Sequence, residues 1–336
     1  MHAPVLVTRA SFPDIVDSLR EHFHVSDNAD DVVWNQAELI ARLQGKSGAI
    51  THGSDRIDAP LLAACPGLRA VCNVGVGYNN IDVDACTSRG VLVTNTPGVL
   101  TDTTADFGFA LMMATARRIA ESEHFVRRGQ WEKTGRYDMF IGTDIHHTTL
   151  GILGMGRIGQ AIAKRAALGF DMRVIYYNRS RLPVEIEASS RAQYVDKNRL
   201  LREADHLIVV VPYSASSHHA IGASELSLMK PTATLTNIAR GGVVDDAALA
   251  GALRNHTIAA AGLDVFEGEP AIHPDLLSVP NIVLTPHIGS ASVATRRAMA
   301  SLASDNLSAA FGYGKFAGHP PSAVNPEVLS NWTSTP

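Results

Sequence analysis

The sequence predicts an α/β protein of two doubly wound parallel-sheet domains with a cleft between them. Two observations predict this fold class. Short β-type runs alternate with amphipathic helical runs along the chain, an alternation typical of parallel sheets with helices on both faces. The length of 336 residues also suits two domains that each bury a core of their own.

The first hundred residues form one complete α/β series. Its expected strands are 5–7, 49–51, 70–73 and 91–94, and its expected helices are 14–22, 36–43 and 83–89. The turn Thr96-Pro97-Gly98 closes the series. We therefore expect a first domain of residues 1–101 that is completed by residues 290–336.

A long helix is expected to begin near Thr103, with Thr101 or Asp102 as its N-cap. Residues 107–114 make this helix apolar nearly all round, so it must be buried on several sides. A core helix and a dimer contact both satisfy that pattern. The polar-aromatic segment 129–147 follows, and we expect it to pack on a partner subunit or to line a cleft.

The stretch 149–159, T-L-G-I-L-G-M-G-R-I-G, predicts a dinucleotide-binding turn. An apolar strand breaks into Gly154, Gly156 and Gly159, and a helical pattern over 157–168 follows. The first glycine allows a tight turn, the second lets backbone approach a pyrophosphate, and the third lets the helix pack closely on the strand. Free amide groups at the helix N-terminus would bind the phosphate groups. A strand expected at 172–177 completes the βαβ unit.

The α/β alternation resumes after this unit. Its expected strands are 207–211, 233–238, 259–264 and 282–284, and each ends in a polar loop. A last helix at 292–311 is expected to cross back to the first domain, and the tail from Gly312 onward to lie on the surface. Residues 102–289 are thus expected to form a nucleotide-binding domain. Ligands bind beyond the carboxyl ends of such strands, so the polar loops should surround the cleft.

Composition excludes several classes of protein. Lys plus Arg is 29 and Asp plus Glu is 33, so the net charge of −4 argues against nucleic acid or an anionic membrane as the main partner. The three cysteines are spaced for neither a disulfide framework nor a zinc site, and no metal site is expected. The N-terminus lacks a signal-peptide pattern, and no apolar run is long enough to span a bilayer. We expect a cytoplasmic protein.

Three polar clusters are candidates for catalysis: Arg240 in N-I-A-R-G-G, Glu269 in D-V-F-E-G-E-P and His287 in T-P-H-I-G-S. Reduction of a 2-keto acid needs a cation that binds the carboxylate and polarises the keto oxygen, and an acid that protonates the alkoxide. A carboxylate beside an imidazole favours its charged form. Each residue also has a structural alternative. Arg240 could bridge a surface carboxylate, Glu269 could be a solvated charge with Glu267 as a rival, and His287 could be an ordinary loop residue.

These clusters, together with V-G-V-G-Y-N-N-I-D, T-D-T-T-A-D, G-I-L-G-M-G-R-I-G and P-H-I-G-S-A, resemble the D-isomer-specific 2-hydroxyacid dehydrogenase family along almost the whole chain. Segment 142–159 is most similar to the bacterial glyoxylate/hydroxypyruvate reductase B branch, also called 2-ketogluconate reductase. The resemblance implies a flavodoxin-like substrate-binding domain, a Rossmann NAD(P)-binding domain and a homodimer.

The resemblance also implies roles for individual residues. Arg240 would bind the substrate carboxylate and keto oxygen, Glu269 would orient and charge the imidazole, and His287 would donate the proton. The backbone amides of Val76 and Gly77 would bind the other side of the carboxylate. The implied cofactor contacts are Thr104, Gly154, Gly156, Arg157, Ile158, Gly159, Asn178, Arg179, Ser180, Val211, Pro212, Ser217, Ile238, Ala239, Asp264, His287 and Gly289.

One position departs from the NAD-type pattern. An NAD enzyme places Asp or Glu after the second strand to bind the ribose 2′-hydroxyl, whereas this chain has Asn178-Arg179-Ser180. These side chains can donate hydrogen bonds to a 2′-phosphate, and the arginine adds charge. A turn with a solvated arginine is the alternative. The sequence therefore predicts NADP(H) as the preferred cofactor, with NAD(H) possible.

The predicted activity is NADPH-preferring reduction of glyoxylate, hydroxypyruvate or 2-keto-D-gluconate to the D-2-hydroxy acid. Two rival functions share the same motifs. A 3-phosphoglycerate dehydrogenase usually adds a regulatory domain after the core, and this chain stops at Pro336. A dinucleotide-sensing binding protein of the corepressor type would carry long disordered extensions, which this sequence lacks.

Overall fold

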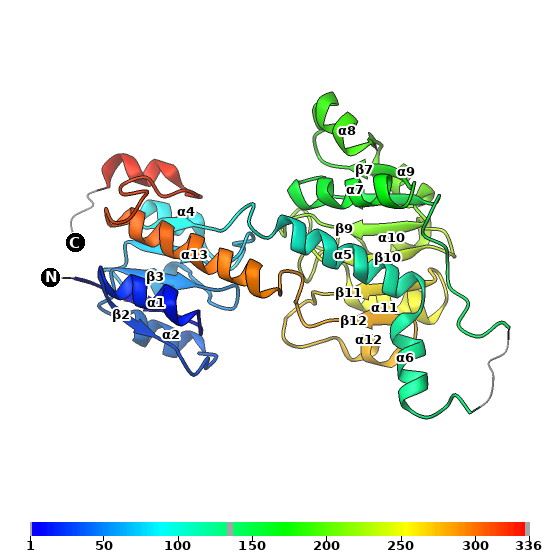
Figure 1. Ribbon diagram of the computed structural model, residues 1–336, viewed down its shortest axis with the longest axis horizontal. Coiled ribbons are helices and arrows are strands. Elements are labelled where there is room, and N and C mark those ends of the chain that lie inside the picture. The colour runs from blue at the N-terminus through cyan, green and yellow to red at the C-terminus, as the bar shows by residue number, and fades with distance from the viewer. Residues whose placement is uncertain (1, 133–136, 333–336) are drawn as a thin grey trace. The chain divides into compact units, whose positions relative to one another are not determined.

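The computed structural model describes residues 2–132 and 137–332. The chain forms two compact units, one of Met1–Leu100 with Ala291–Pro336 and one of Thr101–Ser290. Each unit is built on a parallel sheet with helices packed against it (Figure 1). The predicted class of two parallel-sheet α/β domains is confirmed.

The first unit contains a five-stranded sheet in the order β2-β1-β3-β4-β5. Its strands are β1 Ala3–Val7, β2 Phe23–Asp27, β3 Gly48–Thr51, β4 Ala70–Asn73 and β5 Leu92–Thr94. Its helices are α1 Pro13–Arg20, α2 Gln36–Leu43, α3 Ala59–Ala64, α4 Val83–Ser88 and α13 Val293–Ala310, with a 3₁₀ turn at Pro326–Asn331. Helix α13 packs closely on β3, where a Cβ added at Gly48 would lie 2.8 Å from Leu307 Cδ1.

The second unit contains a seven-stranded sheet in the order β12-β11-β10-β9-β6-β7-β8. Its strands are β6 Thr149–Leu153, β7 Arg173–Tyr177, β8 Ala192–Tyr194, β9 His206–Val209, β10 Thr234–Asn237, β11 Ala260–Leu263 and β12 Ile282–Leu284. The chain passes from β6 to β7 on one side and returns to β9 on the other. The topological switch point, where open α/β sheets bind ligands, therefore lies at the carboxyl end of β6.

Two apolar cores cover the two faces of this sheet, because neighbouring strand residues point to opposite faces. The helices of this unit are α5 Thr101–Ala116, α6 Ile119–Arg127, α7 Arg157–Gly169, α8 Val184–Ser190, α9 Lys197–Glu203, α10 Ala223–Leu228, α11 Asp246–Arg254 and α12 Pro274–Ser278. Helix α5 packs against α7, β10 and β11, which accounts for its apolar surface within the chain. It begins at Thr101, so Thr101 and Asp102 lie in its first turn rather than capping a helix at Thr103.

The tail after α13 differs from the expected surface segment. Asn325 is buried, accepts a hydrogen bond from Val93 N at 2.7 Å and donates to Val91 O at 2.9 Å. Ala323 forms a bridge with Thr94 at the end of β5. The tail therefore extends the edge of the first sheet. Among the described residues, no helix combines the length and apolar character that crossing a membrane requires.

Candidate active site

Many of the predicted ligand residues of the second unit follow the carboxyl ends of six of its strands. Gly154 follows β6, Asn178 follows β7, and Val211 follows β9. Arg240 follows β10, Asp264 and Glu269 follow β11, and His287 follows β12. Because all seven strands are parallel, these loops share one edge of the sheet.

The local geometry requires glycine at two of the three glycine positions of the turn, Gly154 and Gly159, and leaves open space at Gly156. Gly154 has a φ of +105°, and a Cβ there would lie 2.8 Å from the backbone N of Val211. A Cβ at Gly159 would lie 2.4 Å from Gly154 O, so this glycine lets α7 approach β6. Gly156 is the N-cap of α7, has open space around it and offers no side chain to the first amide groups. These amides are therefore available to an anion.

The loop after β7 contacts this turn. Asn178 Oδ1 accepts a hydrogen bond from Met155 N at 2.7 Å, which leaves the Asn178 Nδ2 group as a donor. Arg179 and Ser180 are exposed, and so is Arg157 at the start of α7, whereas Ile158 is half-buried. Positions 178–180 therefore offer hydrogen-bond donors and a positive charge and no carboxylate. Such a loop suits an anionic group.

Some of the other predicted cofactor contacts already form hydrogen bonds within the chain, and some do not. Thr104 Oγ1 is buried and has no hydrogen-bond partner in the described part of the chain. Ser217 Oγ instead closes its own turn, accepting from Ser214 N at 2.7 Å and donating to Pro212 O at 2.9 Å. Ile238 and Ala239 are buried below the same edge. The glycine cradle and the orphan Thr104 hydroxyl fit a bound dinucleotide.

His287 and Glu269 form an ion-pair geometry, with 2.7 Å between His287 Nδ1 and Glu269 Oε2. Glu269 Oε1 also accepts from Phe266 N at 3.0 Å. Burial raises the pKa of the Glu269 carboxyl, but the hydrogen bond and charge of His287, the Phe266 amide and the charge of Arg240 outweigh burial and hold that pKa below its usual range. Glu269 is therefore held as a carboxylate in contact with His287 Nδ1.

Asp264 holds the loop that presents His287. Its carboxylate accepts from Thr285 Oγ1 at 2.7 Å, Ile288 N at 2.9 Å and Gly289 N at 2.8 Å. Burial nevertheless raises the pKa of Asp264 above its ordinary value. His287 has a φ of +54° at the centre of this loop, a conformation that non-glycine residues seldom adopt. The sequence predicted Asp264 only as a cofactor contact. The structure shows that Asp264 also holds the loop of His287 in place through these three hydrogen bonds.

Arg240 lies near Glu269 because the loop after β10 packs against the loop after β11, with no space for a side chain at Gly241. A Cβ at Gly241 would lie 1.7 Å from Phe266 O, so the loop after β10 lies directly against the loop after β11. Burial lowers the pKa of Arg240, and the Glu269 carboxylate opposes that effect. The Arg240 guanidinium also donates to Ala239 O at 2.7 Å. The second unit therefore brings together Arg240, Glu269 and His287.

Glu267, the sequence rival of Glu269, lies with a different histidine. Its Oε2 is 2.9 Å from His219 Nε2. His218, His219 and Glu267 place one possible metal-ligand atom each within 4.8 Å of one another at the surface, a grouping that the cysteine spacing does not indicate. Position 269 rather than 267 therefore contacts His287.

Val76 and Gly77 lie in the first unit, in the loop after β4. Their carbonyl groups are held by asparagine side chains, at 2.8 Å from Asn95 Nδ2 and 2.9 Å from Asn73 Nδ2. Within residues 2–132 and 137–332, no acceptor is found for the amides of Val76 and Gly77. The sequence signal for this arrangement is an asparagine at the end of each of two neighbouring strands, Asn73 as the last residue of β4 and Asn95 directly after β5.

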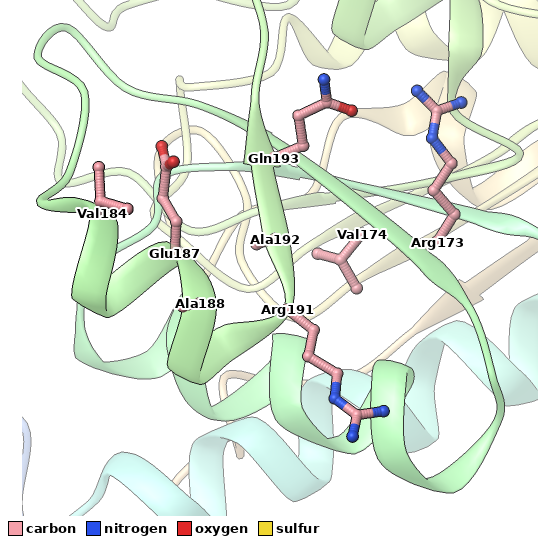
Figure 2. A pocket seen from close by; sticks show the side chains of 8 residues that line it. All are labelled: Arg173, Val174, Val184, Glu187, Ala188, Arg191, Ala192 and Gln193. Carbon is pink, nitrogen blue, oxygen red and sulfur yellow. The ribbon is translucent and has the colours of Figure 1, made fainter.

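A separate hollow of about 430 Å³ lies between α8 and strands β7 and β8 (Figure 2). Its lining includes Arg173 and Val174, at the amino end of β7, and Gln193 of β8. The glycine-rich turn follows the opposite, carboxyl end of β6. We therefore do not assign this hollow to the dinucleotide.

A glycine-rich turn at the switch point and a paired histidine at the same sheet edge define an NAD(P)-binding oxidoreductase. The chain belongs to the D-isomer specific 2-hydroxyacid dehydrogenase family. Residues 109–289 match the family model described as "D-isomer specific 2-hydroxyacid dehydrogenase, NAD binding domain".

Similar proteins span nearly the whole chain. The glyoxylate reductase of Thermococcus onnurineus is 46% identical over 333 residues, with 98% of each chain covered, and that of Pyrococcus horikoshii is 45% identical with the same coverage. The Thermus thermophilus TT0316 protein is 40% identical with a TM-score of 0.86, covering 96% of this chain and 99% of its own. The Sinorhizobium meliloti NADPH-dependent glyoxylate/hydroxypyruvate reductase, solved with NADP and malonate, is 37% identical with a TM-score of 0.84, covering 96% and 97%.

Proposed function

We propose that this protein reduces small 2-keto acids to D-2-hydroxy acids and prefers NADPH, with glyoxylate, hydroxypyruvate and 2-keto-D-gluconate as its substrates. The observation that carries the proposal is the 2.7 Å contact of His287 with Glu269, beside Arg240 and on the edge that holds the glycine-rich turn. The names of the glyoxylate reductases and of the Sinorhizobium NADPH-dependent enzyme support it.

In this proposal His287 protonates the oxygen of the reduced keto group. The charged imidazole donates from Nε2, because Nδ1 is engaged with Glu269. Arg240 binds the substrate carboxylate and polarises the keto oxygen. The amides of Val76 and Gly77 bind the same carboxylate as N–H donors. The bound dihydronicotinamide supplies the hydride.

The cofactor preference rests on the loop after β7. Asn178 Nδ2, Ser180 and Arg179 offer donors and a positive charge to a 2′-phosphate, and an acidic residue is absent from these three positions. We also propose that the other cofactor contacts given in the sequence analysis, from Thr104 to Gly289, bind the dinucleotide. Residues 1–101 with 290–336 form its substrate-binding domain, residues 102–289 its cofactor domain, and the working form is a cytoplasmic homodimer.

The first experiment follows NADPH absorbance with the three acids and the phosphorylated 3-carbon keto acid in parallel, and repeats each assay with NADH. We expect turnover with NADPH that clearly exceeds turnover with NADH. Equal efficiency with both cofactors would contradict the preference. NADPH binding without turnover of any acid would favour the sensing function, and turnover of only the phosphorylated 3-carbon keto acid would favour the phosphoglycerate enzyme.

The proton-donor role of His287 is tested by His287→Ala. We expect kcat to fall by about 10²- to 10⁴-fold, the usual contribution of a positioned acid, while NADPH still binds. His256→Ala is the matched control, since His256 is also exposed and has a similar φ of +52°. Retained turnover in the His287 variant would show that another group delivers the proton.

A further inference from the structure

The loop between β7 and α8 contains two arginines with different surroundings. Arg181 forms a double hydrogen bond with Glu187 of α8, at 2.9 Å from Nε to Oε1 and 2.7 Å from Nη2 to Oε2. Arg179 is exposed, and no ion pair of its side chain is found in the described part of the protein. One arginine is thus committed to a carboxylate, and the other is available to a ligand.

Tyr176 connects this ion pair to the backbone of the loop. Its Oη donates to Glu187 Oε1 at 2.7 Å and accepts from Leu182 N at 2.9 Å. The ring is fully buried. Burial, followed by the Glu187 hydrogen bond, raises the pKa of Tyr176 to about 12, so the hydroxyl keeps the proton that it donates.

The loop is therefore fastened at both ends. Asn178 is joined to the glycine-rich turn through Met155 N, and Arg181 and Leu182 are joined to Glu187 and Tyr176. Arg179 and Ser180 are the two residues between these attachments, and both are exposed. Ordering a side chain or loop before binding reduces the entropy lost when a ligand binds.

Glu187 needs a cation at this position. Its side chain is only 9% exposed, and an unpaired carboxylate there would be costly and would also repel a nearby phosphate. Figure 2 shows the Glu187 carboxylate and the Arg191 guanidinium pointing away from each other. Among described residues, Arg181 is the one basic side chain paired with Glu187.

We propose that Tyr176, Arg181 and Glu187 form a positioning network that presents Arg179 and Ser180 to the cofactor 2′-phosphate, and that Arg181 itself does not bind this phosphate. The inference rests on the proposed preference for NADPH. It assigns cofactor selectivity to a glutamate and a tyrosine that make no contact with the phosphate.

The test measures binding of 2′,5′-ADP and of 5′-AMP by calorimetry, so that it needs no turnover. The variants are Arg181→Ala, Glu187→Ala, their double variant and Tyr176→Phe. We expect each single variant to weaken 2′,5′-ADP binding by about threefold to tenfold and to change 5′-AMP binding by less than about twofold. The double variant should be no weaker than either single one, because both members act through one interaction.

Three further variants serve as references. Arg179→Ala should lose most of the difference between the two nucleotides, and Glu185→Gln, an exposed change on the same helix, should leave both affinities unchanged. Glu187→Gln keeps an oxygen acceptor for Tyr176 and should retain part of the wild-type affinity. Retained 5′-AMP binding shows that a variant is folded.

The outcomes separate this inference from the proposed function. If Glu187→Ala leaves 2′,5′-ADP binding unchanged or tightens it, the released Arg181 binds the phosphate and the network is wrong. The cofactor preference still stands in that case, because the wild-type protein selects 2′,5′-ADP. If the wild-type protein binds 2′,5′-ADP no better than 5′-AMP, both the preference and the network are overturned.

Discussion

At the scale of single residues, two glutamates separated by Gly268 have different partners. Glu269 contacts His287, and Glu267 contacts His219. The pKa of Glu269 lies below its usual range, so its carboxylate is charged wherever histidines ordinarily titrate. The proposed proton donor His287 contacts the charged Glu269, whereas Glu267 contacts a different histidine.

Glu269→Gln is therefore expected to lower kcat by roughly 10- to 100-fold, because the amide keeps the shape but does not stabilise a charged imidazole. The matched control, Glu267→Gln, should change kcat by less than about twofold. In the wild type, protonation of Glu269 should reduce activity only as the pH falls below the ordinary glutamate pKa of 4.5. Equal losses in the two variants would contradict the assignment.

His52, in the loop after β3, provides a residue-scale prediction for stability. Burial, reinforced by the charges of Arg9 and Arg296, lowers the pKa of His52 to about 4 from 6.5. The unfolded chain therefore binds a proton more readily than the folded one between these values. The free energy of unfolding should fall by up to roughly 3 kcal/mol as the pH drops from about 6.5 to about 4.

His52→Gln should remove much of this pH dependence, as measured by urea unfolding at several pH values. His24→Gln, an exposed change on β2 of the same unit, is the control and should keep the wild-type slope. Parallel slopes for wild type and His52→Gln would show that the acid sensitivity comes from other groups.

At the scale of elements, the distance between β6 and α7 determines whether the amides of α7 can bind an anion. Gly159 permits the approach, because a Cβ there would lie 2.4 Å from Gly154 O. Gly169, the last residue of the same helix, has no atom within 4 Å of its missing Cβ. In helix α7, close packing therefore requires a glycine at position 159 but not at position 169.

Gly159→Ala should destabilise the protein by roughly 1 to 3 kcal/mol, the usual cost of overpacking, and should weaken NADPH binding. Gly169→Ala should leave binding unchanged and stabilise by up to roughly 1 kcal/mol through lower entropy of the unfolded chain. Thermal unfolding and calorimetry measure both effects. If the two alanines behaved alike, close packing at Gly159 would not be the reason for its glycine.

At the scale of the whole molecule, the first unit is made of two segments far apart in the sequence. Asn325 joins them, because its amide pairs with Val93 N, Val91 O and Thr87 Oγ1 inside the sheet edge. Helix α13 adds apolar contacts on β3 and β4. The stability of this unit therefore depends on residues that follow the second unit in the chain.

Asn325→Ala should lower the stability of the first unit by roughly 2 to 4 kcal/mol, since it leaves a buried amide and a carbonyl unpaired. Hydrogen exchange should accelerate in β5 and remain unchanged in β10. Ser330→Ala, which removes one exposed hydrogen bond to Glu327 O, should cost less than about 0.5 kcal/mol. Unchanged exchange in β5 would mean that the tail does not support the sheet.

Elements with strong local patterns were predictable from the sequence. Strand β4 and helix α2 have the predicted bounds, because β4 is a continuous buried run and α2 begins with a capping box at Asn35 and Glu38. Strands β2 and β8 were missed. Both lie at sheet edges, where only part of the strand is buried and the apolar signal is weak.

The sequence by itself determined the α/β class, the glycine-rich turn and the candidate residues Arg240, Glu269 and His287, because the class follows from local periodicity and the turn and the candidates follow from short motifs. Only the tertiary structure decided which glutamate contacts His287 and that Arg181 is committed to Glu187. Those contacts depend on how closely separate loops approach, as at Gly241 against Phe266. The distances between loops are determined by the packing of strands and helices, which spacing along the chain does not specify.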